Sequence, residues 1–458
     1  MNYHKNEITS ALVDHALTLK YEEIPMEVIS RTKQMFLDYL GVAYGGLIVA
    51  ESSNPIIDGV IELSNGSKGE CTLLGREEKL PPQYASLVNG TLAHSMDFDD
   101  THRDAVIHIG TPLFSVLLAL SEGKHLSGKD FLSAAVVGYD VTGKIGRAHG
   151  GAVHARGFHP TATTGIFGCT AAGARLLGYT KDQTMNALGL NVSQAAGSTQ
   201  FLENGSWNKR FHTGLTAHNA ILSLVMARNE YLGASSPLEG SHGYFELYAN
   251  GSRGADKALD QLGRDFEVMN TAVKPYPCCR YSHATIDAVT DMIASESISI
   301  KDISTIDITM GSTGYGLVAY PPEMKRNPTN IVEGQFSVYF AAAAAADSGS
   351  YSWSDYEKLS NDEIIRVMQG TTVLLNESWG AGMESEIEIS LSDGKKLKRK
   401  VEYPKGEPEN PMSWEEMSQK FTEWGNLAIG KQKTKSIESR ISNLEQLENI
   451  DELIGFLS

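Results

Sequence analysis

The chain has 458 residues, more than one hydrophobic core usually supports, so we expect two domains. Its hydrophobic fraction of 41% and charged fraction of 21% are those of a folded globular protein, and no run of about 20 apolar residues predicts a membrane span. A formal net charge of -17 argues against nucleic acid or an anionic membrane as a partner, because both would be repelled.

Capping signals mark helix starts in the first 260 residues. Ser127-Gly-Lys-Asp130 and Thr180-Lys-Asp-Gln183 are typical capping boxes, and Gly178 and Gly233 are expected to end helices. The sequence therefore predicts a mostly helical body.

The start of the chain and its cysteines predict a cytoplasmic location. Residues 1–7 lead into an amphipathic segment and lack the apolar run of a secretory signal. Four cysteines in so long a chain do not make a disulfide framework, and none of their spacings fits a zinc finger.

The pattern changes after residue 277. Residues 303–310 and 387–391 alternate as strands do, and Asp393-Gly394 before Leu397 and Val401 predicts a hairpin. Helices are expected at 282–294, from 360 onward and over the alanine run 341–346.

The chain end returns to a helical pattern, with a capping box at Ser413-Trp-Glu-Glu416 and spaced apolar residues over 436–457. The predicted fold is mostly α with an α+β lid. A large all-helical domain is formed by both chain ends, 1–265 and 405–458, and a smaller α+β domain is inserted at 266–404.

The histidines are concentrated in one part of the chain. All thirteen lie at or before His283, and eleven fall between His94 and His283. Histidine titrates near neutral pH, so this clustering predicts a functional region. The predicted functional region consists of four segments in which histidines stand with basic or acidic side chains: 89–108, 157–161, 208–214 and 274–283.

Two other interpretations of these segments stay open. Their aspartates and threonines are also typical helix caps, and their basic residues also suit a solvated surface. Asp97, Asp99 and His102 have the chemistry of metal ligands, but their spacing matches no standard metal motif, so we predict no metal.

The four segments resemble the 2-methylcitrate dehydratase (MmgE/PrpD) family, most closely its cis-aconitate decarboxylase branch. The blocks 37–41 and 238–240 belong to the same resemblance, which runs over nearly the whole chain. It implies a helical main domain, a smaller α+β lid, a homodimer, and a cleft that binds a small polycarboxylate with no metal or organic cofactor.

The resemblance also assigns site residues. It implies catalytic roles for His108, His159, Lys209 and Asp97, with the two histidines as an acid/base pair and Asp97 orienting an imidazole. The residues expected to bind the substrate are Thr101, Lys274, Phe201, Cys279, Arg280 and Tyr320. The lysines, with Arg280, would neutralise carboxylates and stabilise developing negative charge.

Three positions depart from the family pattern: Phe201 replaces a methionine, Cys279 replaces a histidine, and His108-Ile-Gly replaces His-Pro-Ser. Decarboxylation of cis-aconitate to itaconate is the favoured activity, because its motif positions are nearly complete. Dehydration of 2-methylcitrate or a related hydroxy acid, epimerisation of a dicarboxylate such as iminodisuccinate, and a catalytically silent binding or scaffold protein remain the alternatives.

Overall fold

The computed structural model describes residues 7–67, 69–249, 251 and 253–458. The chain divides into two compact units: Met1–Val273 with Ser413–Ser458, and Lys274–Met412. The second unit begins and ends eight residues later than the predicted lid (274 against 266, 412 against 404). Its role as a lid stays a prediction. Residues 1–6, on which the prediction about a secretory signal rests, lie outside the described residues.

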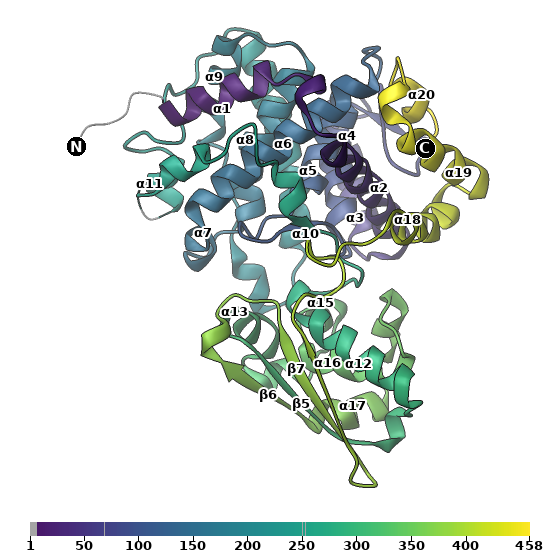
Figure 1. Cartoon of the computed structure of the whole chain (residues 1–458). Helices are drawn as coiled ribbons and strands as arrows, with labels where there is room; N and C mark the ends of the chain where they lie inside the picture. Colours follow the sequence, from purple (N-terminus) through teal and green to yellow (C-terminus); the bar gives the residue numbers. More distant parts are fainter. Residues whose placement is uncertain (1–6, 68, 250, 252) are drawn as a thin grey trace. The chain divides into compact units, whose positions relative to one another are not determined.

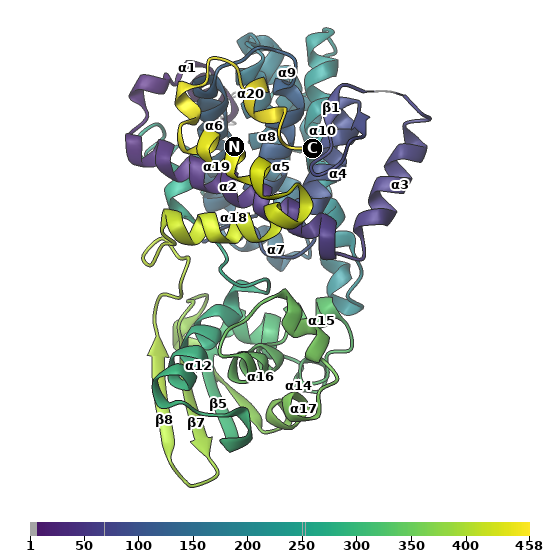
Figure 2. The same ribbon diagram turned by 90° about the vertical axis from the view of Figure 1, so that its right-hand side faces the viewer.

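The first unit is built from helices contributed by both ends of the chain (Figures 1 and 2). Its helices are α1 (Glu7–Thr18), α2 (Met26–Val49), α3 (Ser53–Leu63), α4 (Pro82–His94), α5 (Gly110–Ser121), α6 (Gly128–His149), α7 (Ala152–Ala155), α8 (Pro160–Leu176), α9 (Lys181–Asn191), α10 (Asn208–Arg228), α11 (Tyr244–Tyr248), α18 (Trp414–Ala428), α19 (Lys431–Ser442) and α20 (Asp451–Ile454). Two short antiparallel ladders pair β1 (Cys71–Thr72) with β2 (Lys79–Leu80), and β3 (Thr101–His102) with β4 (Thr271–Ala272).

The predicted helix starts are confirmed. Ser127, Thr180 and Ser413 each accept a hydrogen bond from the backbone N–H three residues on, and the acidic or amide side chain there completes the capping box of α6, α9 and α18. Gly178 follows α8 with a φ of 66°, as a C-terminal glycine does.

The stop predicted at Gly233 is wrong, because α10 already ends at Arg228. A Cβ at Gly233 would lie 2.1 Å from the carbonyl oxygen of Asn186 in α9. Close backbone packing therefore accounts for this glycine.

A glycine contact sets the distance between α4 and α10. A Cβ on Gly214 would lie 2.1 Å from the carbonyl oxygen of Leu87, and one on Gly90 would lie 3.0 Å from the Cα of Gly214. Any side chain here would push the helices apart. The contact brings the end of α4 toward the start of α10, and both carry predicted site residues.

The C-terminal helices pack on the first unit, as predicted. In Figure 2, α18 and α19 lie alongside α2, with which both make contacts. The chain end is also tied to this unit, because the carbonyl oxygen of Leu457 accepts hydrogen bonds from Tyr44 Oη at 3.0 Å and the Gly75 amide at 2.8 Å.

The second unit has a four-stranded sheet in the order β6-β5-β7-β8. The predicted strand is β5 (Ile303–Gly311), and the predicted hairpin joins β7 (Ser385–Leu391) to β8 (Lys396–Val401) in antiparallel register. The sequence missed β6 (Thr371–Asn376), which pairs parallel to β5.

The helices of the second unit are α12 (His283–Glu296), α13 (Ser312–Gly314), α14 (Pro322–Lys325), α15 (Ile331–Gln335), α16 (Val338–Ser348) and α17 (Asp362–Gln369). Inward-facing isoleucines of β5 and β7 share a core with α12 and with the alanine run of α16 (Figure 1). The chain is therefore mostly α with a smaller α+β part, as predicted. Within the part of the chain that the structure describes, no helix has both the length and the apolar character for crossing a membrane.

Candidate functional site

The loop after α4 carries three aspartates into the interior of the first unit. His94 is the last residue of α4, and its Nδ1 lies 2.8 Å from Asp99 Oδ2, with both residues buried. Asp97 adopts a φ of 51°, a conformation that costs energy for a residue with a side chain. The backbone of this loop is therefore strained where it presents its carboxylates.

His108 is held by three neighbours on the same side of its ring. Its Nδ1 lies 2.9 Å from the carbonyl oxygen of Asp100, and 3.3 Å from both Thr101 Oγ1 and Asp99 Oδ2. Because a carbonyl oxygen only accepts hydrogen bonds, Nδ1 carries the proton and Nε2 carries the lone pair of the neutral ring. Its backbone N–H also donates to Thr161 Oγ1 at 3.0 Å.

His159 stands directly before α8, at the loop-to-helix junction expected from the following proline. It is the N-cap residue, with φ -85° and ψ 108°, the extended geometry that proline imposes on its predecessor. Its Nδ1 lies 3.1 Å from Nδ1 of His212 on α10, so one ring donates to the other. The Phe201 ring packs edge-on at 6.2 Å.

His94, His108 and His159 form what we call the imidazole cluster. Ring centroids are 4.5 Å apart for His94 and His108, 6.1 Å for His94 and His159, and 6.3 Å for His108 and His159. Burial lowers the pKa of His94 to about 4, with Lys209 adding to the shift and Asp99 opposing it. Burial, then His212 and Lys209, lowers the pKa of His159 well below its usual range. Both rings are therefore neutral at neutral pH.

The two aspartates Asp99 and Asp100, next to the cluster, have pKa values shifted in opposite directions. Burial by itself would raise the pKa of Asp99, but attraction and hydrogen bonds to His108 and His94 outweigh it and hold that pKa well below its usual value. Burial, together with the charge of Asp99, raises the pKa of Asp100 to about 7. Asp100 accepts hydrogen bonds from Tyr139 Oη at 2.7 Å and from the Gly110 amide.

Lys209 brings a positive charge to the same region. It lies in the first turn of α10 and forms an ion pair with Asp97. Asp99 lies at hydrogen-bonding distance from His94 and His108, and the orienting role that the resemblance implies for Asp97 stays a prediction. Arg210, beside Lys209, is buried and donates to Ser52 Oγ at 3.1 Å.

Lys420 on helix α18 anchors the strained loop that carries Asp97 and Asp99. Lys420 Nζ donates to the carbonyl oxygen of Phe98 at 2.7 Å, pairs with Asp38 at 2.5 Å, and lies 3.8 Å from the centroid of the Phe98 ring. Phe98 stands between Asp97 and Asp99. Asp38, in one of the blocks that carry the family resemblance, therefore acts on this loop through Lys420.

The remaining predicted residues belong to the second unit. Lys274 is buried, and the Cys279 amide donates to the Gln335 carbonyl at 2.8 Å. Arg280 donates from Nε and Nη2 to both oxygens of Glu407, at 2.6 and 2.5 Å, so its charge already has a partner within this unit. Tyr320 is 58% exposed. Binding of substrate by these four residues stays a prediction.

The site residues assigned from the resemblance did not include three that the structure places in the site: His94, His212 and Asp99, which the sequence considered only as a metal ligand. All three lie inside the segments that the sequence singled out, but the family resemblance drew attention to their neighbours. The spacing of His94 and Asp99 across a helix end was the available signal, because a helix that stops at its histidine allows the loop to fold back onto it.

Two groups in the site have the residue types of a metal centre. One is the imidazole cluster, and the other combines His94, Asp97, Asp99 and His108; in each, one ligand atom per residue lies within 4.8 Å of the others. His102, which the sequence considered as a ligand, belongs to neither group. Its Nε2 lies 2.8 Å from Glu267 Oε2 in a separate buried ion-pair network.

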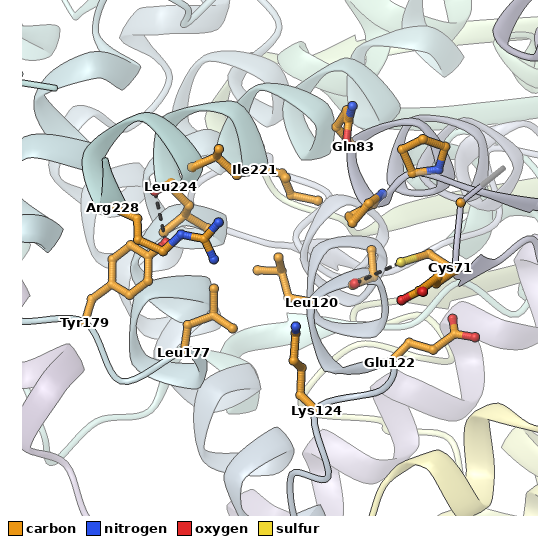
Figure 3. A pocket seen from close by; sticks show the side chains of 16 residues that line it. Cys71, Gln83, Leu120, Glu122, Lys124, Leu177, Tyr179, Ile221, Leu224 and Arg228 are labelled. Atoms are coloured by element: carbon orange, nitrogen blue, oxygen red, sulfur yellow. Dashed lines mark hydrogen bonds between the residues drawn. The ribbon is translucent and has the colours of Figure 1, made fainter. Parts of the chain in front are cut away.

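A cavity in the first unit, of about 490 Å³, is lined by no predicted site residue. In Figure 3, apolar side chains such as Leu120 and Leu177 lie among the charged Glu122, Lys124 and Arg228. Glu122 is engaged by Thr72 and Lys79. Among the described residues that line this cavity there is no histidine.

Comparison with known proteins identifies similar sequences over the whole chain. Residues 10–255 match the MmgE/PrpD N-terminal domain, and residues 276–446 match the MmgE/PrpD C-terminal domain.

Curated relatives carry one activity in their names. A cis-aconitate decarboxylase of Aspergillus terreus is 26% identical over 99% of this chain and 96% of its own length. The Homo sapiens cis-aconitate decarboxylase is 27% identical over 98% and 94%, and the cis-aconitate decarboxylase-like protein oryM of Aspergillus oryzae is 25% identical over 99% and 98%.

Proposed function

Because the chain belongs to the MmgE/PrpD family, we propose that this enzyme is a cofactor-independent lyase that decarboxylates cis-aconitate to itaconate. The observation that carries the proposal is the imidazole cluster beside the Lys209–Asp97 ion pair. The names of the full-length relatives support the choice of substrate.

The reaction must stabilise the electron pair that carbon dioxide leaves behind on carbon until a proton is added there. The bond between carbon and one carboxylate breaks, carbon dioxide leaves, and the pair spreads over the neighbouring double bond and carboxylate. A proton is then added at carbon, and solvent restores it to the enzyme. An imidazole whose tautomer is fixed, as in His108, suits this transfer. His159 is the partner in the proposed acid/base pair.

Substrate charge must be balanced locally, because the protein as a whole is strongly acidic. The Lys209 ammonium is close enough to the imidazoles to lower the pKa of His94 and of His159, and it forms an ion pair with Asp97. A substrate carboxylate that binds Lys209 would share that ammonium with Asp97 through charge-assisted hydrogen bonds. Substrate binding by Lys274, Arg280 and Tyr320, and by Thr101, Phe201 and Cys279, is part of the same proposal.

One experiment tests the activity. Chelator-treated protein is incubated in heavy water with cis-aconitate, 2-methylcitrate or iminodisuccinate, and the products are followed by NMR. Itaconate carrying solvent deuterium on carbon is the expected result. Loss of water from 2-methylcitrate, or inversion of iminodisuccinate, would replace this proposal with one of its alternatives. Inertness toward all three acids would point to a silent binding protein.

Variants then test the residue roles. His159→Ala should lower kcat about 10²- to 10⁴-fold, the range for loss of a general acid or base. Lys209→Met should raise KM for the polycarboxylate. The matched control is His125→Asn, since the His125 side chain is 82% exposed. Near wild-type turnover by folded His159→Ala would refute its assignment.

Two further parts of the proposal concern the state of the protein. If the protein is a homodimer, light scattering should give a mass of twice 49.7 kDa. The mass of a monomer at micromolar concentration would contradict this. A cytoplasmic location predicts recovery in the cytosolic fraction on cell fractionation.

A further inference from the structure

The imidazole cluster also has the composition of a metal-binding site. His94, His108 and His159 are all buried, and one ring nitrogen of each lies within 4.8 Å of the others. Imidazole nitrogen is a preferred ligand of Zn²⁺ and of neighbouring first-row divalent cations. Three histidines around one point are a common protein ligand set for such an ion.

In each of the three rings, Nδ1 already has a hydrogen-bonding partner. His94 Nδ1 bonds the Asp99 carboxylate at 2.8 Å, and His108 Nδ1 bonds the Asp100 carbonyl at 2.9 Å. Both acceptors require a proton on Nδ1, which leaves the lone pair on Nε2. Histidines that bind metals almost always donate their other N–H to a carboxylate or a carbonyl in this way. His159, whose Nδ1 faces His212 at 3.1 Å, meets the same condition when it is the donor.

An unsatisfied atom supports a ligand at this point. His94 Nε2 is buried, and within the described part of the chain it has no hydrogen-bond partner. A buried acceptor without a partner costs free energy, and such an atom in a native protein often marks a bound group. A cation on the cluster would satisfy it.

The local charges permit a cation. Two carboxylates, Asp97 and Asp99, and one ammonium, Lys209, adjoin the cluster, so the neighbouring formal charge is -1. The Lys209 ammonium is paired with Asp97, which reduces its repulsion of a second positive ion. Nitrogens on one tetrahedral Zn²⁺ lie about 3.4 Å apart, so side-chain rotations that close the cluster from 4.8 Å would suffice.

We propose that His94, His108 and His159 bind one Zn²⁺-like divalent cation, and that this ion inhibits the enzyme by occupying the imidazoles that handle the proton. The inhibitory part rests on the proposed function, whereas the binding part does not.

Binding of the cation is tested by titrations that do not depend on an activity assay. Chelator-treated protein is titrated with ZnCl₂ in a calorimeter and with CoCl₂ by visible absorption. One equivalent is expected, with a Kd on the order of 10 µM or tighter and the Co²⁺ band of a four- or five-coordinate site. His94→Gln should weaken binding at least about tenfold, and Asp99→Asn about 10- to 100-fold, as for other groups that support a metal ligand.

A surface histidine provides the control. His125→Asn should leave the titration unchanged, and circular dichroism confirms that each variant is folded. No binding up to about 1 mM, or binding that is lost in His125→Asn and kept in His94→Gln, would overturn the site.

Inhibition is measured separately. Zn²⁺ should compete with cis-aconitate, and a chelator should restore turnover. Full activity at a Zn²⁺ concentration that saturates the titration would refute the inhibitory role. Absence of turnover with every acid in metal-free buffer would refute the proposed function instead, and the titration would still decide the site.

Discussion

Replacing Lys420 with methionine should both destabilise the protein and loosen the loop that carries Asp97 and Asp99. Lys420 is 6% exposed and Asp38 is 2% exposed. Burial raises the pKa of Asp38, and the Lys420 ammonium opposes that shift. Methionine keeps most of the packing volume but leaves Asp38 without this ion-pair partner and the Phe98 carbonyl without this donor.

The size of the effect follows from these contacts. Breaking a buried ion pair by removing one partner costs about 3–5 kcal/mol, and loss of the cation over the Phe98 ring adds about 0.5–2 kcal/mol. A surface pair gives the matched control. Lys181 and Asp14 are 46% and 53% exposed, so Lys181→Met should cost only about 0–1 kcal/mol.

Urea unfolding of both variants measures the difference, and hydrogen exchange of the peptide spanning residues 95–101 locates it. Faster exchange in Lys420→Met, with a lower kcat, is expected because Phe98 loses its anchor. Adding Asp38→Asn should recover part of the stability, since no unpaired charge remains. Equal stability of Lys420→Met and Lys181→Met would refute the reasoning.

Three other predictions concern packing and buried charge. Gly214→Ala should destabilise by about 1–3 kcal/mol in urea unfolding, because its Cβ meets a backbone carbonyl; Gly59→Ala, whose Cβ meets nothing within 4 Å in helix α3, should stabilise by about 0.5–1 kcal/mol. Burial by itself would raise the pKa of Glu267, but hydrogen bonds and attraction to His102 and Lys144 outweigh it, and the pKa falls to about 2. The ionised carboxylate therefore contributes about 3 kcal/mol to stability at neutral pH. This contribution is lost as the pH falls from about 4.5 toward 2. The stability deficit of Glu267→Gln should therefore shrink between pH 7 and pH 3, and a pH-independent deficit would contradict this. Glu407→Gln should cost about 3–5 kcal/mol by leaving Arg280 buried without its carboxylate; a change under about 0.5 kcal/mol would show that the pair adds nothing to stability.

Much of the fold could be predicted from the sequence, because its signals act over a few residues. The capping boxes at Ser127, Thr180 and Ser413 start helices since their hydrogen bonds span three residues. Asp393-Gly394 forms the predicted hairpin turn, and Pro160 fixes the backbone of His159. The clustering of histidines in the sequence also indicated the segments from which the structure brings His94, His108 and His159 together. Strand β6 was missed because a short edge strand carries a weak pattern of its own and is defined by its neighbour β5.

Only the tertiary structure decided which side chains of the candidate site meet in space. The sequence determined which residue types are present and which local elements carry them, but His159 meets His212 across 53 residues, and Lys420 reaches the Phe98 carbonyl across 322. Such contacts depend on how the helices pack together, and not on any local pattern. Packing likewise places Asp99 against His94 and His108 and pairs Asp97 with Lys209, and no local pattern in the sequence specifies either contact.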